Sequence, residues 1–436
     1  MYQQLIDYFE NKSVLILGFG KEGQSTYNFL RKFYPDKKIA IADKRELKID
    51  DNNVELITGD KYLDAINDFD LVMQSPGISL REVNVEATTE ITGQMDLFLR
   101  FADCIKIGIT GTKGKTTTTT LVYNIVKASG KKCALIGNIG VPVFESLDDT
   151  DGLVAVIEMS CHQLEFAKKS PDISIFTNIY PEHLDHYNGF EGYYGAKLNI
   201  VNNQNENNFF IYNSDQKELA EILDFTKIKS KTIPVSYEYS LKDEFLQKLT
   251  KINDNLKGYH THHDIFLAAN AARCLGISDE DIEKGIKSFE PIAHRMEKVG
   301  TWKDITFYND SIATIPYAVM CAVNALEKVD TLIFGGLDRG IDYSTFVTDL
   351  NESKLNNLIG LPETGKNIID ELKKINCSKN LVIVDTMDEA VECAYKCTEK
   401  GKICLFSPAA SSYNRYRNFE EKGNHFKNLA KEYGTK

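Results

Sequence analysis

Residues 104–120, CIKIGITGTKGKTTTTT, constrain the fold of this chain more than any other stretch. An apolar, β-prone run at Ile105, Ile107 and Ile109 leads into three glycines and then into residues that suit a helix. This order of strand, glycine loop and helix is typical of a phosphate-binding loop, in which backbone N–H groups turn toward phosphate oxygens. The stretch therefore predicts a nucleotide site, with ATP as the ligand, in preference to an ordinary strand-to-helix connection.

The side chains of the loop suit the parts of a bound nucleotide. The Lys115 ammonium can reach the outer phosphates, and the Thr116 hydroxyl can complete a Mg²⁺ shell. The spacing differs from the general G-x-x-x-x-G-K-[ST] motif, because Ile109 stands five residues before Gly114 and the loop reads GTKGKT. We assign nucleotide binding to Gly111, Thr112, Lys113, Gly114, Lys115, Thr116 and Thr117.

The length of 436 residues predicts about three domains at ~150 residues each. A hydrophobic content of 42% and a charged content of 26% are those of an ordinary globular protein. The net charge of −12 repels polyanions, so we expect no nucleic-acid partner. The N-terminus lacks a signal-peptide pattern and no run of about 18 apolar residues occurs, which predicts a cytoplasmic protein without membrane insertion. Nine cysteines without a C-x-x-C pair or zinc spacing are expected to be reduced packing residues.

The first segment alternates strand and helix patterns, which predicts an open parallel sheet in an α/β fold. GFGKEG at 18–23 follows a strand, and Asp43 ends the next strand about 25 residues on, as in a dinucleotide fingerprint. A dehydrogenase would need a catalytic domain with a proton-transfer pair, and the separate loop at 111–116 argues against one. We expect the helix N-terminus after Gly20 to take the diphosphate of a nucleotide-like ligand.

Further polar groups lie at strand ends of the same segment, where ligands sit in open parallel sheets. Lys44 and Arg45 follow the second strand, and the turn Ser75-Pro76-Gly77 follows a later one. A solvated strand end explains Lys44 and Arg45 as well as ligand binding does, so both interpretations stay open.

The second segment, from about residue 104 to 290, carries a polar set that suits hard-cation and phosphate chemistry. Glu158 ends an apolar strand, and His183 stands between two acidic residues after another strand. Lys197 falls in the helical pattern GYYGAKLNI, where the sequence by itself favours a surface charge over a functional role. The His-rich stretch at 258–264 fits no standard metal spacing, and we expect a helix to begin at its end with DIFLAANAARCLGI.

The third segment again alternates strands and helices, which predicts a second doubly wound domain. One helix is expected from NLIGL through GKNIIDELKKI, residues 357–375. The candidate site residues follow strands, at Asp310, Ser311, Asp338, Arg339, Ser411 and Ser412.

Motifs along the whole chain resemble those of the Mur ligases, and among them the glutamate-adding MurD type. The motifs, in chain order, are GTKGKTTTT, GNIG, EMSCHQLE, NIYPEHLDH, YYGAKLNI, HRME, YNDS, GGLDRG and SPAASSYNRYRNFEEKGNHF. The resemblance implies a Rossmann-like UDP-sugar domain at 1–103, a central P-loop ATPase-type domain at 104–292, and a Rossmann-like amino-acid domain at 293–436.

The resemblance also implies the reaction and its site. ATP phosphorylates the carboxylate of UDP-N-acetylmuramoyl-L-alanine, and the amine of D-glutamate attacks the acyl phosphate, in peptidoglycan precursor synthesis by a monomer. The implied catalytic residues are Lys115, Glu158, His183 and Lys197. Two Mg²⁺ ions are implied at Thr116, Glu158, His183 and Lys197, the last as a carbamate. Nucleotide contacts are implied at Asp264, Arg295 and Asp310. Substrate contacts are implied at Lys21, Lys44, Arg45, Ser75, Gly77, Asn138, Gln163, His183, Thr314, Arg339, Ser412 and Phe419.

The chain departs from the family pattern at HTHHD (260–264), at Ile312 and Ile315, at Leu337 and at Arg339, where lysine is common. Three alternatives therefore stay open: an L-glutamate-adding variant, another acid–amino-acid ligase of the superfamily that includes folylpolyglutamate synthetase, and a non-catalytic nucleotide-binding regulator. The glycine motif at 18–23 favours the UDP-sugar enzyme, and the intact catalytic set argues against the regulator.

Overall fold

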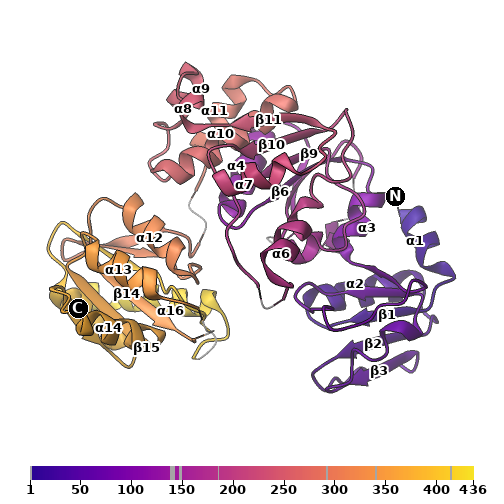
Figure 1. The fold of residues 1–436 in the computed structure, drawn as a ribbon, viewed down its shortest axis with the longest axis horizontal. Coiled ribbons are helices and arrows are strands. Elements are labelled where there is room, and N and C mark those ends of the chain that lie inside the picture. The colour runs from indigo at the N-terminus through magenta and orange to yellow at the C-terminus, as the bar shows by residue number, and fades with distance from the viewer. Residues whose placement is uncertain are drawn as a thin grey trace. The chain divides into compact units, whose positions relative to one another are not determined.

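The computed structural model describes residues 2–137, 143–146, 150–184, 186–290, 293–338, 341–412 and 415–436. The chain forms two compact units, one of residues 1–256 and 261–289 and one of residues 257–260 and 290–436. The units contain three β-sheets flanked by helices, which confirms the α/β class (Figure 1). The predicted boundaries after residues 103 and 292 stay predictions.

The first sheet has five strands in the order β3-β2-β1-β4-β5. Its strands are β1 (Val14–Leu17), β2 (Ile39–Asp43), β3 (Val54–Thr58), β4 (Leu71–Gln74) and β5 (Glu90–Thr92). Its helices are α1 (Tyr2–Glu10), α2 (Lys21–Phe33) and α3 (Gln94–Phe101), with a short 3₁₀ turn at Ile66–Asp68. Every pairing is parallel, which confirms the predicted open sheet. The central strands β1 and β4 are buried at every position, as expected for apolar strands covered on both faces.

The second sheet has six parallel strands in the order β11-β10-β9-β6-β8-β7. They are β6 (Ile105–Thr110), β7 (Cys133–Gly137), β8 (Val154–Glu158), β9 (Ile173–Phe176), β10 (Phe209–Asn213) and β11 (Lys231–Val235). The helices are α4 (Lys115–Ala128), α5 (Cys161–Leu164), α6 (Gly189–Leu198), α7 (Lys217–Asp224), α8 (Tyr237–Ser240), α9 (Glu244–Leu249), α10 (Tyr259–Cys274) and α11 (Asp279–Lys287), with a 3₁₀ turn at Val143–Ser146.

Helix α10 begins five residues earlier than expected, because Tyr259 and the histidines after it are helical. Tertiary contacts make this polar stretch compatible with a helix. His263 is buried and bonds Asp215 through Nε2 at 3.0 Å, while the His262 ring lies parallel to that of Tyr237. The sequence pattern could not predict this earlier helix start, because the contact partners Asp215 and Tyr237 lie far away along the chain.

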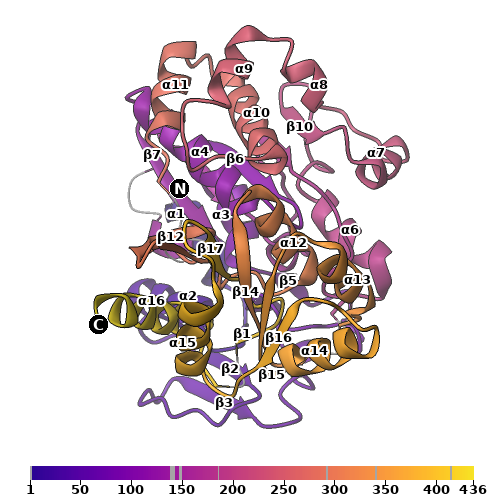
Figure 2. The same cartoon turned by 90° about the vertical axis from the view of Figure 1, so that its left-hand side faces the viewer.

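The third sheet has six strands in the order β12-β13-β17-β14-β15-β16. They are β12 (Glu297–Trp302), β13 (Ile305–Asn309), β14 (Val329–Gly336), β15 (Asn357–Glu363), β16 (Asn380–Ile383) and β17 (Ile403–Phe406). The helices are α12 (Pro316–Ala325), α13 (Ser344–Glu352), α14 (Thr364–Lys374), α15 (Met387–Cys397) and α16 (Phe419–Thr435). Figure 2 shows α13 and α14 on one side of β14, β15 and β16, and α15 and α16 on the other, which confirms the doubly wound arrangement.

The predicted single helix over 357–375 is wrong. Residues 357–363 form β15, which pairs with β14 and β16, and the helix begins only at Thr364. An apolar run as short as NLIGL fits a buried strand and a buried helical turn equally well. Here the pairing with β14 and β16 makes it a strand. Strands β12 and β13 form an antiparallel hairpin at the edge of the sheet. The predicted alternation of strands and helices did not include this hairpin.

Candidate active site

The glycine loop lies between β6 and α4, at the carboxyl end of a central strand. Gly111 has φ +149°, and a Cβ there would lie 2.0 Å from the Thr177 hydroxyl. Gly114 has φ +81°, and a Cβ there would lie 2.6 Å from Oδ1 of Asp264. Both positions thus need glycine for backbone conformation and for space. The N-terminus of α4 follows directly, which gives the loop the partial positive charge that attracts phosphate.

Two residues after β9 hold the loop in place. Lys113 N donates to Oδ1 of Asn178 at 2.8 Å, and the Lys113 carbonyl accepts from the Thr177 hydroxyl and from Nδ2 of Asn178. Thr112 N donates to the Asn178 carbonyl at 2.9 Å. Sequence reasoning missed Thr177 and Asn178 as site residues, although the motif NIYPEH begins with Asn178 and follows an apolar strand.

Lys115 and Lys197 meet at one oxygen. Both ammonium groups donate to the Gly111 carbonyl at 2.9 Å, and Lys115 also donates to the Thr112 carbonyl at 3.0 Å. Lys197 is only 1% exposed, so the surface-charge interpretation of this residue is wrong. Burial and the nearby Lys115 cation lower the pKa of Lys197 to about 7. A substantial fraction of its amine is therefore neutral near neutral pH.

A second layer of contacts surrounds the loop. The Lys113 ammonium pairs with Glu182 at 3.0 Å, and the Lys113 and Lys115 cations outweigh burial and hold the pKa of Glu182 below its ordinary value. The Thr112 hydroxyl lies 3.0 Å from that of Tyr193, whose ring is 6.2 Å from the exposed His183 ring. The segment after β9 therefore brings His183 to the same end of the sheet as the loop.

Glu158 ends β8 beside the foot of the loop. In the parallel pairing it lies opposite Ile109, and it is only 1% exposed. Thr116, in the first turn of α4, is buried as well. No group of three or more His, Cys, Asp or Glu side chains arranged to hold a metal occurs in the described part of the chain. One buried carboxylate with a threonine hydroxyl is nonetheless a donor set that suits Mg²⁺, which usually takes the rest of its shell from water and substrate phosphates.

Asp264 lies next to the loop on α10. Its Oδ1 accepts a hydrogen bond from the Thr118 hydroxyl at 2.9 Å, and it stands against Gly114 as described above. The side chain is buried. The structure thus places this predicted nucleotide residue beside the start of α4, although the helix that carries it begins more than 140 residues later in the chain.

The predicted UDP-sugar residues lie at the carboxyl end of the first sheet. The Ser75 hydroxyl donates to the Gly18 carbonyl at 2.9 Å, which ties the turn after β4, with Gly77, to the glycine motif before α2. Lys21 begins α2, Lys44 follows β2, and both side chains are exposed. The structure thus brings these residues from three strand ends to one edge.

The carboxylate of Asp43 forms its hydrogen bonds with groups of the protein. Its carboxylate accepts from Phe19 N at 2.8 Å and from the Arg45 guanidinium at 3.0 and 2.8 Å. The hydrogen bonds from Arg45 hold the pKa of Asp43 well below its usual range. Arg45 is therefore fixed by a bidentate ion pair while its side chain stays 66% exposed. The Arg45 guanidinium therefore has a fixed orientation at the edge where a ligand would bind, which favours the interpretation of Arg45 as a binding residue.

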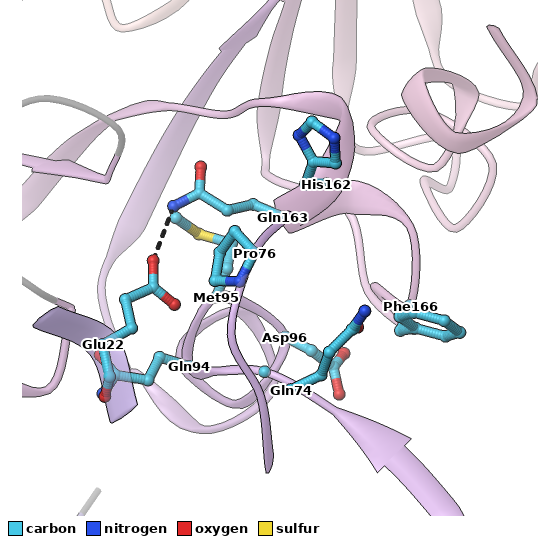
Figure 3. A pocket seen from close by; sticks show the side chains of 10 residues that line it. Glu22, Gln74, Pro76, Gln94, Met95, Asp96, His162, Gln163 and Phe166 are labelled. Atoms are coloured by element: carbon cyan, nitrogen blue, oxygen red, sulfur yellow. Dashed lines mark hydrogen bonds between the residues drawn. The ribbon is translucent and has the colours of Figure 1, made fainter. Parts of the chain in front are cut away.

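Gln163 joins the first two sheets of the larger unit. Its side chain completes a capping box with Ser160 at the start of α5, and Nε2 donates to Glu22 of α2 at 3.2 Å. Figure 3 shows this bond at the wall of a cavity of about 20 Å³, which Pro76 and His162 also line. Burial raises the pKa of Glu22, although the Gln163 bond opposes the shift. The cavity has room for about one water molecule.

In the smaller unit, Asp310 follows β13 and is buried. Its carboxylate accepts from Met296 N at 3.1 Å and from the Ser407 hydroxyl at 2.7 Å. Arg295 precedes Met296 and is half-buried. The carboxylate of Asp310 therefore bonds the backbone of the residue next to Arg295, the other residue that the resemblance implies for nucleotide binding from the C-terminal domain.

The predicted amino-acid residues gather at the same edge. Ala409 N donates to the Ala313 carbonyl at 3.0 Å, which joins the segments that carry Ser412 and Thr314. Phe419 begins α16, and its ring lies 5.9 Å from that of His294. The hydroxyl of Ser412 is buried and has no hydrogen-bond partner among the described residues. Asn138, Arg339 and Asp185, one of the two acidic residues around His183, fall outside the described residues.

Comparison with known proteins identifies the family. The MurD-like N-terminal domain of the Mur ligases matches residues 12–94, the Mur ligase middle domain matches 109–271, and the Mur ligase glutamate ligase domain matches 294–410. The chain is also 33% identical to a UDP-N-acetylmuramoylalanine–D-glutamate ligase of Lactobacillus johnsonii, with 99% of each chain covered. The chain belongs to the Mur ligase family. This confirms the resemblance on which the site residues were chosen, while their individual roles stay predictions.

Other Mur ligases support this assignment. A Clostridium botulinum ligase of the same name is 31% identical over 98% of each chain. Among solved structures, a MurF ligase of Thermotoga maritima in complex with ADP has a TM-score of 0.60 at 16% identity, covering 96% of this chain and 95% of that one. A UDP-N-acetylmuramate–alanine ligase of the same organism has a TM-score of 0.59 at 17% identity, covering 98% and 100%. These structures confirm the three-part Mur ligase fold.

Within the described residues, no helix combines the length and the apolar character that crossing a membrane requires. All nine cysteines are free, as expected for reduced residues.

Proposed function

We propose that this Mur ligase joins D-glutamate to UDP-N-acetylmuramoyl-L-alanine with the hydrolysis of ATP, in the synthesis of peptidoglycan precursors. The observation that carries the proposal is the near full-length similarity to ligases named for this reaction, combined with a buried Lys197 beside the Lys115 loop. Both substrates are small molecules, and we propose that the protein acts on them as a monomer in the cytoplasm.

A carboxylate is a poor electrophile, so the reaction needs activation before the amide can form. A carboxylate oxygen of the UDP substrate attacks the γ-phosphorus of ATP, and ADP leaves. The glutamate amine then attacks the acyl carbon, the phosphate departs with its bonding electrons, and the amine loses a proton. Lys115 holds the transferring group from the glycine loop, where backbone N–H groups and the start of α4 offset its negative charge. Bound Mg²⁺ would supply further charge neutralisation at Thr116 and Glu158.

We further propose that Lys197 carries a carbamate. A neutral amine adds to CO₂ through its nitrogen and loses a proton, and the pKa of about 7 provides that neutral amine. In the unmodified state the Lys197 ammonium shares an oxygen with the Lys115 ammonium. A carbamate would replace this repulsion with attraction and would supply an anionic ligand beside His183 and Glu158.

The amino-acid end is proposed in the smaller unit. The buried Ser412 hydroxyl can donate to one glutamate carboxylate together with the backbone at Phe419. Thr314 and Arg339 are assigned to the other carboxylate, where a guanidinium can bind bidentately. Ile312 and Ile315 make this wall less polar than is usual in the family, so L-glutamate addition is the second candidate. Two further candidate functions are the ligation of another acid to an amino acid and a non-catalytic role as a nucleotide-binding regulator.

The direct test measures phosphate release with ATP, Mg²⁺ and UDP-N-acetylmuramoyl-L-alanine. Separate reactions contain D-glutamate, L-glutamate, D-aspartate or no amino acid. We expect D-glutamate to be preferred, because a site that pairs two carboxylates rejects a shorter analogue strongly. A preference for L-glutamate would select the second candidate, and equal rates with D-aspartate would contradict the two-carboxylate argument.

Two variants test the loop in the same assay. Lys115→Ala should reduce turnover by at least about a thousandfold, because it removes the cation on the transferring phosphoryl group. Lys127→Ala, at the exposed end of the same helix, should retain the parent rate. Phosphate release by Lys115→Ala within a few-fold of the parent would overturn the assignment of the ATP site.

A further inference from the structure

One bond between side chains joins the start of α2 to α5, and so links the first two sheets of the larger unit. Glu22, in the first turn of α2, accepts from Nε2 of Gln163 at 3.2 Å. Figure 3 shows the two side chains pointing toward each other at the cavity that Pro76 also lines. The resemblance assigns Gln163 to the UDP substrate, so Glu22 contacts a proposed binding residue directly.

The Gln163 amide is held at both of its ends. Its Oε1 accepts from Ser160 N at 3.1 Å and from the Ser160 hydroxyl at 3.2 Å, while its Nε2 donates to Glu22. Since the oxygen end meets donors and the nitrogen end meets a carboxyl group, the orientation of the amide is defined. Nε2 carries a second proton, which can be donated to a ligand.

The backbone of Glu22 is held by a second glutamine. Nε2 of Gln94, the first residue of α3, donates to the Glu22 carbonyl at 2.9 Å. Oε1 of the same side chain accepts at 3.2 Å from the backbone N–H of Phe144, in the 3₁₀ turn of the second sheet. The position of Glu22 relative to Gln163 is therefore fixed, and a change at the Glu22 carboxyl group acts on the amide.

The Glu22 carboxyl group lies where a negative charge is costly. Burial raises its pKa above the ordinary value, and the bond from Gln163 offsets only part of this shift. Of the described titratable side chains nearby, two line the same cavity and two are exposed: Asp96 of α3 and His162 of α5, and Lys21 and Glu145. The neutral acid is therefore more accessible to Glu22 than to a carboxyl group on the surface.

We propose that Glu22 is a positioning residue for the UDP substrate, which holds the Gln163 amide and takes up a proton from solvent when the substrate binds. The inference rests on the proposed function, in which the N-terminus of α2 receives the diphosphate. Glu22 is in the first turn of that helix, so a bound diphosphate adds negative charge near its carboxyl group and favours the neutral acid. The neutral group keeps an oxygen that accepts from Gln163. The affinity should then fall as the pH rises from the pKa of Glu22 in the free protein to its higher pKa in the complex.

The test is calorimetric titration of the full chain with UDP-N-acetylmuramoyl-L-alanine between pH 5.5 and 8, without ATP. The parent should bind at least about threefold more weakly at pH 8 than at pH 5.5. Titrations in two buffers of different ionisation heat should show an uptake of at least about 0.3 protons per bound ligand within this range. The measurement on the parent chain needs no variant.

Three variants separate the proton from the hydrogen bond. Glu22→Gln keeps an acceptor for Gln163 but does not titrate, so it should lose the pH dependence. Glu22→Ala removes the acceptor and should bind at least about threefold more weakly than Glu22→Gln at every pH. Glu46→Gln, the matched control at an exposed carboxylate after β2, should keep the pH profile of the parent.

Thermal unfolding without ligand gives a second readout. An acid whose pKa is raised by folding lowers the stability of the protein as the pH rises, so Glu22→Gln should gain stability relative to the parent between pH 5.5 and 8. Binding by the parent without proton uptake, or the same pH profile in Glu22→Gln, would overturn this inference and leave the proposed function intact. Failure of the parent to bind the UDP substrate would overturn the proposed function, and this inference with it.

Discussion

At the scale of single residues, burial changes the chemistry that a side chain can perform. Lys197 sits in a helix whose sequence suits the surface, yet the structure buries it against Gly111 and under the cation of Lys115. Lys115 itself is half-buried and keeps contact with two loop carbonyls. Two lysines of one small region are therefore suited to different tasks, and Lys197 is the one whose lowered pKa suits a neutral amine.

This difference predicts different responses to chemical rescue. Lys197→Ala should lose most activity, and high bicarbonate or a short carboxylate such as acetate should restore part of it, by about tenfold or more, as a substitute for the lost carbamate anion. Lys115→Ala serves as the control, because it lacks a cation and no added carboxylate should restore it. The measurement is phosphate release against carboxylate concentration. Equal responses of the two variants would contradict the carbamate assignment, as would an unmodified Lys197 in a high-resolution map of active enzyme.

At the scale of elements, the turn from β6 into α4 depends on close approach by distant segments. The loop is held by Thr177 and Asn178 after β9, and Gly114 stands against Asp264 of α10. The need for glycine at this turn therefore has two sources, the left-handed backbone and the neighbouring carboxylate.

Substitutions of the glycines at the two ends of α4 distinguish the effect of the backbone conformation from that of the neighbouring carboxylate. Gly130, after the end of α4, has φ +75° with nothing within 4 Å of an added Cβ, so Gly130→Ala should cost only about 1 kcal/mol of backbone strain. Gly114→Ala should cost more and should weaken ADP binding at least about tenfold, because the new methyl group displaces Asp264 and shifts the loop. Thermal unfolding and ADP titration of both variants check this. Similar stability and ADP affinity in the two variants would show that the contact with Asp264 has no consequence.

At the scale of the whole molecule, the smaller unit has its own sheet and its own apolar core. Phe307, Ile333 and Phe406 are buried between its helices, and the edge hairpin places Trp302 against Gly434 of α16, where a Cβ would lie 2.4 Å from the ring. A domain with its own core can fold alone.

We therefore expect residues 290–436 to fold when expressed as a separate fragment, with cooperative thermal unfolding and mixed α/β circular dichroism. The control fragment 305–436 lacks β12 and Trp302, so it should unfold at a temperature lower by about 5 °C or more, because one edge strand and a large aromatic contact are lost. A non-cooperative melt of the longer fragment would contradict the predicted division near residue 292.

The sequence by itself determined the features that are local along the chain. Strand, glycine loop and helix follow one another in GITGTKGKT, and the alternation of apolar strands with amphipathic helices specified parallel α/β sheets. Turn glycines and the spacing of apolar residues along a strand or helix depend on residues close in the chain, so both can be recognised without a structure. The departures of the chain from its family are visible at the same level.

Only the tertiary structure decided which groups meet. It placed Thr177 and Asn178 on the loop, made a strand of residues 357–363 and buried Lys197. In each case the partners come from different elements, and the pKa of a lysine or the choice between strand and helix follows from those partners. Burial and strand pairing are properties of the assembled fold, because the energy of a side chain depends on neighbours that the chain brings from a distance.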